Sequence, residues 1–181
     1  NDFQISKNEK AASVSVVSPN LEFHNNLDQT KKSLDELKEL LKTLQIKTNN
    51  QYIQKRQHLS PGTIIGKGKL EEISKNAKSD GTTLLVFDVE LTAGQIKNIK
   101  NLTKLNVIDR CHVILEIFAG HARTKEAKIQ IEMARLKYIL PRLIGFWTHF
   151  SRQKGGVGIR GGEGEQQIEL DRRIVRKKIA S

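Results

Sequence analysis

The stretch that most constrains the fold is residues 82–88, which read Thr-Thr-Leu-Leu-Val-Phe-Asp. A continuous apolar run of this length is typical of a strand buried on both faces. Such strands occur almost only in parallel sheets that carry helices on both sides. The run therefore predicts a central parallel strand with helices packed around it.

Strand and helix patterns alternate around this run. Further strands are expected at residues 12–17, 51–54 and 106–109. Helical spacing of apolar residues predicts helices at 28–44, with Asp28 as N-cap, at 70–77 and at 92–104. Alternation at these lengths indicates βαβ units. The expected fold class is α/β, with a small, mostly parallel sheet and flanking helices over residues 12–120, after a disordered lead-in at 1–11.

The pattern changes after residue 120. Ala127, Ile131, Ala134 and Tyr138 form one apolar stripe of a long amphipathic helix, which Pro141 is expected to kink or to end near residues 144–145. A second helix is expected from about residue 165. The two helices predict an antiparallel hairpin domain over 121–181, with a glycine-rich loop at 152–165. Because the helical pattern still runs at the last residue, we expect the chain to continue.

Positive charge is concentrated in this second domain. The chain of 181 residues carries a net charge of +11. Residues 121–181 hold 14 basic and 6 acidic side chains, whereas the preceding residues hold 17 and 14. This asymmetry favours a nucleic acid or another polyanion as the partner of the C-terminal third.

The glycine-rich loop is the main candidate for that contact. Glycine loses more backbone freedom on ordering than any other residue, so a loop of this composition is expected to be ordered by a partner. Its arginines and lysines favour a phosphate backbone. The candidate binding residues are Arg152, Lys154, Gly155, Gly156, Gly158, Arg160, Gly161, Arg172 and Arg173.

Other candidate sites are weaker. Gly66, Lys67, Gly68 and Lys69 precede a predicted helix and could hold a phosphate, but a tight turn with solvated lysines is the simpler interpretation. Asp88 and Glu90 stand where α/β sites gather, yet no His or Lys has matching spacing, so no catalytic residue is expected. Cys111 is expected to be a small buried residue.

Several classes of function are disfavoured. The five histidines lack metal-ligand spacing, so no metal site is expected. The single cysteine fits a reducing compartment, and no apolar run approaches the roughly 20 residues that cross a bilayer. We therefore expect a cytoplasmic protein, without membrane insertion and monomeric. Because the first residue is not methionine, we expect a processed chain or part of a longer one.

Longer motifs carry a resemblance to a known family. Residues 155–173, Gly-Gly-Val-Gly-Ile-Arg-Gly-Gly-Glu-Gly-Glu-Gln-Gln-Ile-Glu-Leu-Asp-Arg-Arg, resemble the signature that precedes the GTPase domain in HflX-family translational GTPases. Shorter matches in the same order include Ile65-Gly-Lys-Gly-Lys-Leu-Glu-Glu-Ile73, Phe87-Asp-Val-Glu-Leu91 and Leu140-Pro-Arg-Leu143. Gly162-Glu163 stands where the commoner family pattern has one residue, usually proline.

The resemblance implies a function in translation. It implies the N-terminal region of such a protein, with a GTPase domain beyond Ser181 and therefore no enzymatic activity or cofactor in this chain; GTP and magnesium would bind the full-length protein. It also implies binding to the large ribosomal subunit, with the loop reaching ribosomal RNA and a role in splitting or rescuing ribosomes or in their biogenesis. Two alternatives remain: an ATPase that uses the Gly66–Lys69 turn, and a protein-interaction scaffold.

Overall fold

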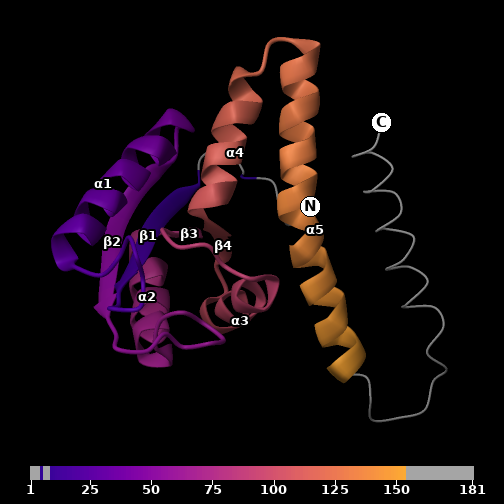
Figure 1. Ribbon diagram of the computed structural model, residues 1–181. Helices are drawn as coiled ribbons and strands as arrows, with labels where there is room; N and C mark the ends of the chain where they lie inside the picture. The colour runs from indigo at the N-terminus through magenta and orange to yellow at the C-terminus, as the bar shows by residue number, and fades with distance from the viewer. Residues whose placement is uncertain (1–4, 6–8, 154–181) are drawn as a thin grey trace. The chain divides into compact units, whose positions relative to one another are not determined.

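The computed structural model describes residue 5 and residues 9–153, with side chains through Ile139 (Figure 1). By packing, the chain divides into two compact units, residues 1–91 with 95–117, and residues 92–94 with 118–181. The first unit contains the sheet, and the second contains the long helix α5 (Lys125–Gln153). The expected domain bounds and the glycine-rich loop stay predictions, because most of the loop lies outside the described residues.

The first unit is built on a four-stranded parallel sheet. Its strands are β1 (Lys10–Val17), β2 (Lys47–Lys55), β3 (Leu84–Phe87) and β4 (Asn106–Asp109). They lie in the order β2-β1-β3-β4, and every pair is parallel. All four residues of β3 are buried, as the apolar run predicts. The α/β fold class is confirmed.

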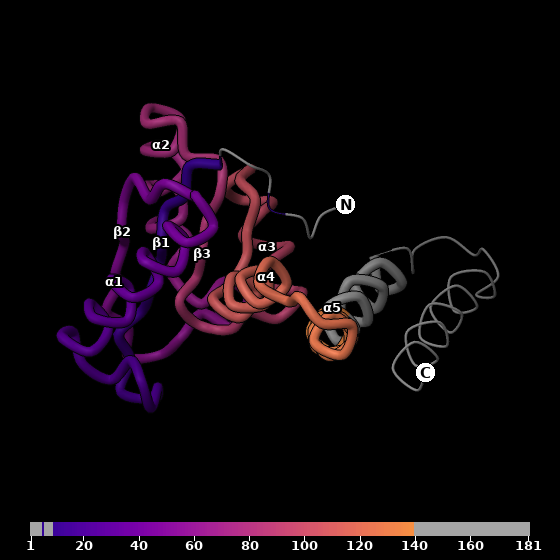
Figure 2. The backbone as a smooth tube through the Cα atoms, turned by 90° about the horizontal axis from the view of Figure 1, so that it is seen from above, coloured from indigo at the N-terminus to yellow at the C-terminus, as the bar shows by residue number. Residues whose placement is uncertain are grey.

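Helices cover both faces of this sheet. The helices that lie wholly or mostly in the first unit are α1 (Leu27–Thr43), α2 (Lys67–Asp80), α3 (Ala93–Thr103) and α4 (Arg110–His121). Leu34, Leu37 and Leu41 of α1 pack with Val113 of α4 on one face. Leu70 and Ile73 of α2 pack with Ile99 of α3 on the other. Figure 2 shows the strands between α1 and α2.

The strand order explains which helix lies on which face. The chain moves outward from β1 to β2 through α1, then returns past β1 to β3 through α2. Because parallel crossovers are right-handed, reversing direction moves the connecting helix to the opposite face. The carboxyl ends of β1 and β3 therefore mark the point where the winding reverses, and α/β proteins bind ligands at such points.

Several expected bounds differ from the structure. β1 begins at Lys10 and Ala11 is fully buried, so the disordered lead-in does not extend to residue 11. Asn26, and not Asp28, is the N-cap of α1, since its side chain accepts a hydrogen bond from the Gln29 N–H. β2 and α2 are also longer than expected. β2 pairs with β1 along its whole length from Lys47 to Lys55, and α2 runs on to the left-handed cap at Gly81.

Two helices depart further from expectation. α4 was not expected, because its sequence Cys-His-Val-Ile-Leu-Glu-Ile-Phe-Ala has apolar residues on several sides and little helical periodicity. α5 (Lys125–Gln153) continues through Pro141 and past residues 144–145, so the expected end there is wrong, while the expected kink stays a prediction. Proline costs one backbone hydrogen bond in a helix interior, and a long helix retains the others. The second helix of the expected hairpin lies outside the described residues.

Candidate functional site at the carboxyl edge of the sheet

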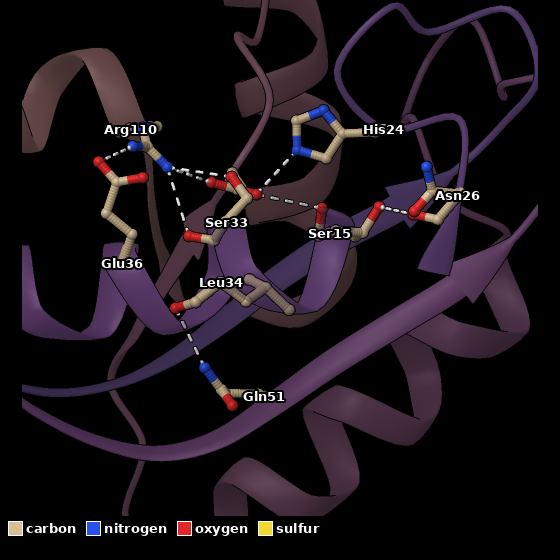
Figure 3. A network of polar contacts seen from close by, with 10 residues as sticks. Ser15, His24, Asn26, Ser33, Leu34, Glu36, Gln51 and Arg110 are labelled. Atoms are coloured by element: carbon tan, nitrogen blue, oxygen red, sulfur yellow. Dashed lines mark hydrogen bonds and ion pairs between the residues drawn. The ribbon is translucent and has the colours of Figure 1, made fainter. Parts of the chain in front are cut away.

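Polar side chains from five segments of the chain meet where the winding of the sheet reverses. Asp88 directly follows β3, Arg110 directly follows β4, and His24 lies in the loop between β1 and α1. Figure 3 shows His24, Arg110 and Ser33 of α1 turned toward one another. These residues, with Asp88 at their centre, Ser15 of β1 and Glu36 of α1, form what we call the Asp88 cluster.

The Asp88 carboxylate is fully satisfied by its neighbours. Its side chain is 0% exposed. His24 Nε2 lies 2.8 Å from Oδ2, and Arg110 Nη1 donates to Oδ1 at 3.0 Å. The Ser15 hydroxyl donates to Oδ2 at 3.4 Å. A buried carboxylate is tolerated only when it is paired and hydrogen-bonded in this way.

Arg110 joins the cluster to α1. Its Nη1 donates to the Ser33 carbonyl oxygen at 3.3 Å and to the Ser33 hydroxyl oxygen at 3.1 Å. Its Nη2 lies 2.7 Å from Glu36 Oε1. Since Arg110 is the first residue of α4, its planar group connects the ends of β3 and β4 with α1. A lysine has only a compact ammonium and could not make all of these contacts.

Proton affinities in the cluster follow from these contacts. Burial raises the pKa of Asp88, but hydrogen bonds from His24, Ser33 and Arg110 outweigh it, so the net pKa is lowered. Burial lowers the pKa of Arg110, whereas the hydrogen bonds and charges of Glu36 and Asp88 raise it more. Both groups are therefore held in their charged forms.

The cluster holds the loop between β1 and α1 in place. The Ser18 N–H donates to the His24 carbonyl oxygen at 2.9 Å, which closes a short turn. The His24 ring is then fixed on Asp88. The Ser15 hydroxyl donates to the same carboxylate, so β1 is tied to Asp88 as well. The contacts thus hold the ends of β1, β3 and β4 against α1.

Sequence reasoning found Asp88 but missed its partners. His24 is 64 residues away and Arg110 is 22, so neither has a spacing that a local motif would contain. The sequence does contain one indication of this pairing, because both Asp88 and Arg110 directly follow buried strands. Glu90, the other carboxylate expected at this edge, is exposed. A second buried carboxylate is Asp109, which accepts from the N–H groups of Leu91 and His112.

The Gly66–Lys69 turn begins α2. Gly66 is the N-cap, and its N–H donates to Gln54 Oε1 at 2.8 Å. Lys69 Nζ lies 2.9 Å from both carboxylate oxygens of Glu72 and 5.5 Å from the centre of the Tyr52 ring. Lys67 is exposed and Gly68 has open space around it. The Gly66 N–H and the Lys69 ammonium, which a phosphate would need, are thus already engaged.

The remaining expected residues are separate from the cluster. Arg152 belongs to the last turn of α5, so the helix reaches two residues into the expected loop. Lys154, Arg160 and the other expected loop and second-helix residues lie outside the described residues. Cys111 is exposed, not buried, on the solvent side of α4. In the described part of the chain no group of His, Cys, Asp and Glu could hold a metal ion, and no helix is long and apolar enough to cross a bilayer.

Comparison with known proteins defines the class. Residues 31–119 match the family model described as the N-terminal region of GTP-binding GTPases, and residues 121–181 match the model of their middle region. A solved GTP-binding protein from Sulfolobus solfataricus in complex with GDP has the same fold, with a TM-score of 0.61 and 25% identity, over 94% of this chain and 44% of that one.

Curated relatives give the family. The chain is 44% identical to the GTPase HflX of Flavobacterium psychrophilum over 95% of its own length and 40% of the relative. It is 50% identical to GTPase HflX of Spirochaeta thermophila over 65% of its own length and 29% of that relative. The chain therefore belongs to the HflX family, and it spans two fifths or less of these relatives.

Proposed function

We propose that this chain is the ribosome-binding region of an HflX-type GTPase. In this proposal the region docks on the large ribosomal subunit, and the glycine-rich segment 152–165 contacts ribosomal RNA. The role of the whole protein would be to split or rescue ribosomes or to assist their assembly. The observation that carries the proposal is the net positive charge of residues 121–181, the part that matches the family's middle region.

Physical chemistry supports an RNA partner for this segment. Arginines and lysines that neutralise phosphates release counterions, and this release supplies much of the affinity for nucleic acids. Glycines between the cations let the backbone approach a phosphate closely. The proposed contacts are made by Arg152, Lys154 and Arg160 with the glycines around them, and by Arg172 and Arg173.

The proposal assigns GTP and magnesium to the rest of the full-length protein. The sequence has no G-x-x-x-x-G-K-[ST] motif, and the groups of the Gly66–Lys69 turn are engaged by Gln54 and Glu72. In the part of the chain that the structure describes, this turn does not fit a nucleotide–magnesium site. The proposed cytoplasmic location and monomeric state follow from the same family function.

Co-sedimentation with isolated large subunits tests the proposal. The Arg152→Ala, Arg160→Ala double variant should bind more weakly than the wild type. The slope of log affinity against log salt concentration should also become shallower, by nearly one for each phosphate contact that is lost. A control variant, Lys125→Ala, Lys128→Ala, removes the same charge from exposed positions at the start of α5. Equal binding by the two double variants would show that the glycine-rich segment is not the contact.

A further inference from the structure

One part of the first unit contains only basic charges. Between Glu39 and Glu71 the chain has six lysines and arginines and no acidic residue. This segment comprises the end of α1, the edge strand β2, the following loop and the start of α2. The net charge of residues 1–120 is close to neutral, and this sum conceals the local excess of positive charge.

Three cations at the carboxyl end of β2 lack acidic partners. Within the described chain, Lys55, Arg56 and Lys67 form no ion pair. The Arg56 guanidinium lies against Gly66, since a Cβ there would come within 2.7 Å of Nη1. Arg56 is thereby placed beside Lys67. Lys55 is the last residue of β2 and Lys67 the first residue of α2, and both side chains are exposed.

Phe23 lies in the loop between β1 and α1, residues 18–26, and this loop is hydrogen-bonded to the loop after β2. The Arg56 N–H donates to the Val17 carbonyl oxygen at 2.9 Å, and Asn20 Nδ2 donates to the Gln57 carbonyl oxygen at 3.2 Å. The Ser18 hydroxyl donates to the same Gln57 oxygen at 3.4 Å. The loop after β1 and the loop after β2 are therefore joined at the carboxyl edge of the sheet.

The backbone of Phe23 is fixed by the contacts of its neighbours, and yet its side chain is exposed. Its side chain is 75% accessible to solvent. The next residue, His24, is fixed on Asp88, and the turn from Ser18 to His24 is closed by a backbone hydrogen bond. A single exposed aromatic residue is ordinary on a protein surface. Phe23 differs because its backbone is fixed and because Arg56 lies in the adjoining loop, with Lys55 and Lys67 at the two ends of that loop.

We propose that Phe23, Lys55, Arg56 and Lys67 form a binding surface for single-stranded RNA. The cations would contact the backbone phosphates while a base stacks on the Phe23 ring, the combination that single-strand binding proteins use. An unpaired strand is required, because bases within a duplex have no free face to stack on an aromatic ring. The inference deepens the proposed function, and rests on it for the choice of RNA among polyanions.

Fluorescence anisotropy with a labelled oligouridine of about 12 nucleotides tests this surface. Phe23→Ala should weaken binding by at least about fivefold, the lower bound for loss of one stacked base. Lys55→Gln, Lys67→Gln should reduce the slope of log affinity against log salt by about 1.4. The control Lys31→Gln, Lys38→Gln removes two exposed charges from α1 and should change neither quantity as much. All these side chains are exposed, so the variants should fold.

Several results would overturn the inference. One is that the wild-type chain does not bind oligouridine. Another is that Phe23→Ala and the Lys55→Gln, Lys67→Gln variant bind oligouridine no more weakly than the control does. Weaker binding of Phe23→Ala to large subunits, with unchanged binding to oligouridine, would indicate a protein contact instead. The proposed function fails separately, if substitution of Arg152 and Arg160 leaves subunit binding unchanged.

Discussion

Replacing Asp88 with asparagine tests whether the Asp88 cluster stabilises the first unit. The change keeps the shape of the side chain but removes the charge that Arg110 and His24 share. Breaking a buried ion pair from one side costs about 3–5 kcal/mol, because the remaining charge is left without compensation. In the variant Arg110 still has its ion pair with Glu36, and its side chain is 23% exposed, so the cost should lie at the lower end of this range. We expect a loss of about 3 kcal/mol in the free energy of unfolding.

The pH dependence of this loss has a defined sign. The pKa of Asp88 is lowered in the folded state from its ordinary value of 3.8. Its contribution is therefore present above 3.8 and is lost as the pH falls through the lowered folded-state value. The difference between wild type and variant should be largest near neutral pH and should shrink in acid.

Urea unfolding at pH 7 and at several acidic values measures both effects. Glu71→Gln serves as the control, because it removes one exposed carboxylate from α2. Wild type and control should unfold at similar urea concentrations, and Asp88→Asn at a lower one with an unchanged slope. A loss below about 0.5 kcal/mol at pH 7, the range of ordinary surface changes, would refute this account of the cluster.

Three further changes test individual elements. Asn26→Ala should lower the free energy of unfolding by about 1 kcal/mol, because α1 loses the side chain that accepts the Gln29 N–H, and thermal unfolding would reveal it. Gly81→Ala should cost about 1 kcal/mol or more by urea unfolding, because Gly81 has φ of 73° at the end of α2. Leu37→Ala should cost about 2–5 kcal/mol, because Leu37 is fully buried, and should show the largest shift of the three in the urea midpoint. An Asn26→Ala or Gly81→Ala protein as stable as the wild type would contradict the cap and the backbone conformation described. A Leu37→Ala protein whose free energy of unfolding lies within about 1 kcal/mol of the wild-type value would contradict the burial of Leu37.

The sheet was predictable because its signal is local. The apolar run before Asp88 and the leucine spacing of α1 each specify an element from neighbouring residues. Most expected elements therefore occur in the structure, with shifted ends. α4 was missed because apolar residues on several of its sides hide the helical period.

The Asp88 cluster was not predictable in the same way. Its members come from β1, the following loop, α1 and the ends of β3 and β4, and only the order β2-β1-β3-β4 brings them together. Strand order depends on long-range pairing, which no spacing in the sequence encodes. The sequence could place Asp88 at the correct edge but could not identify His24 or Arg110 as its partners.

The most direct test of the ribosomal account is equilibrium binding of the wild-type chain to isolated large and small ribosomal subunits over a range of salt. The account predicts a clear preference for the large subunit, with log affinity falling linearly as log salt rises. Binding that does not distinguish the two subunits would indicate general attraction of a basic protein to RNA. Binding to the large subunit that does not change with salt would contradict the proposed phosphate contacts.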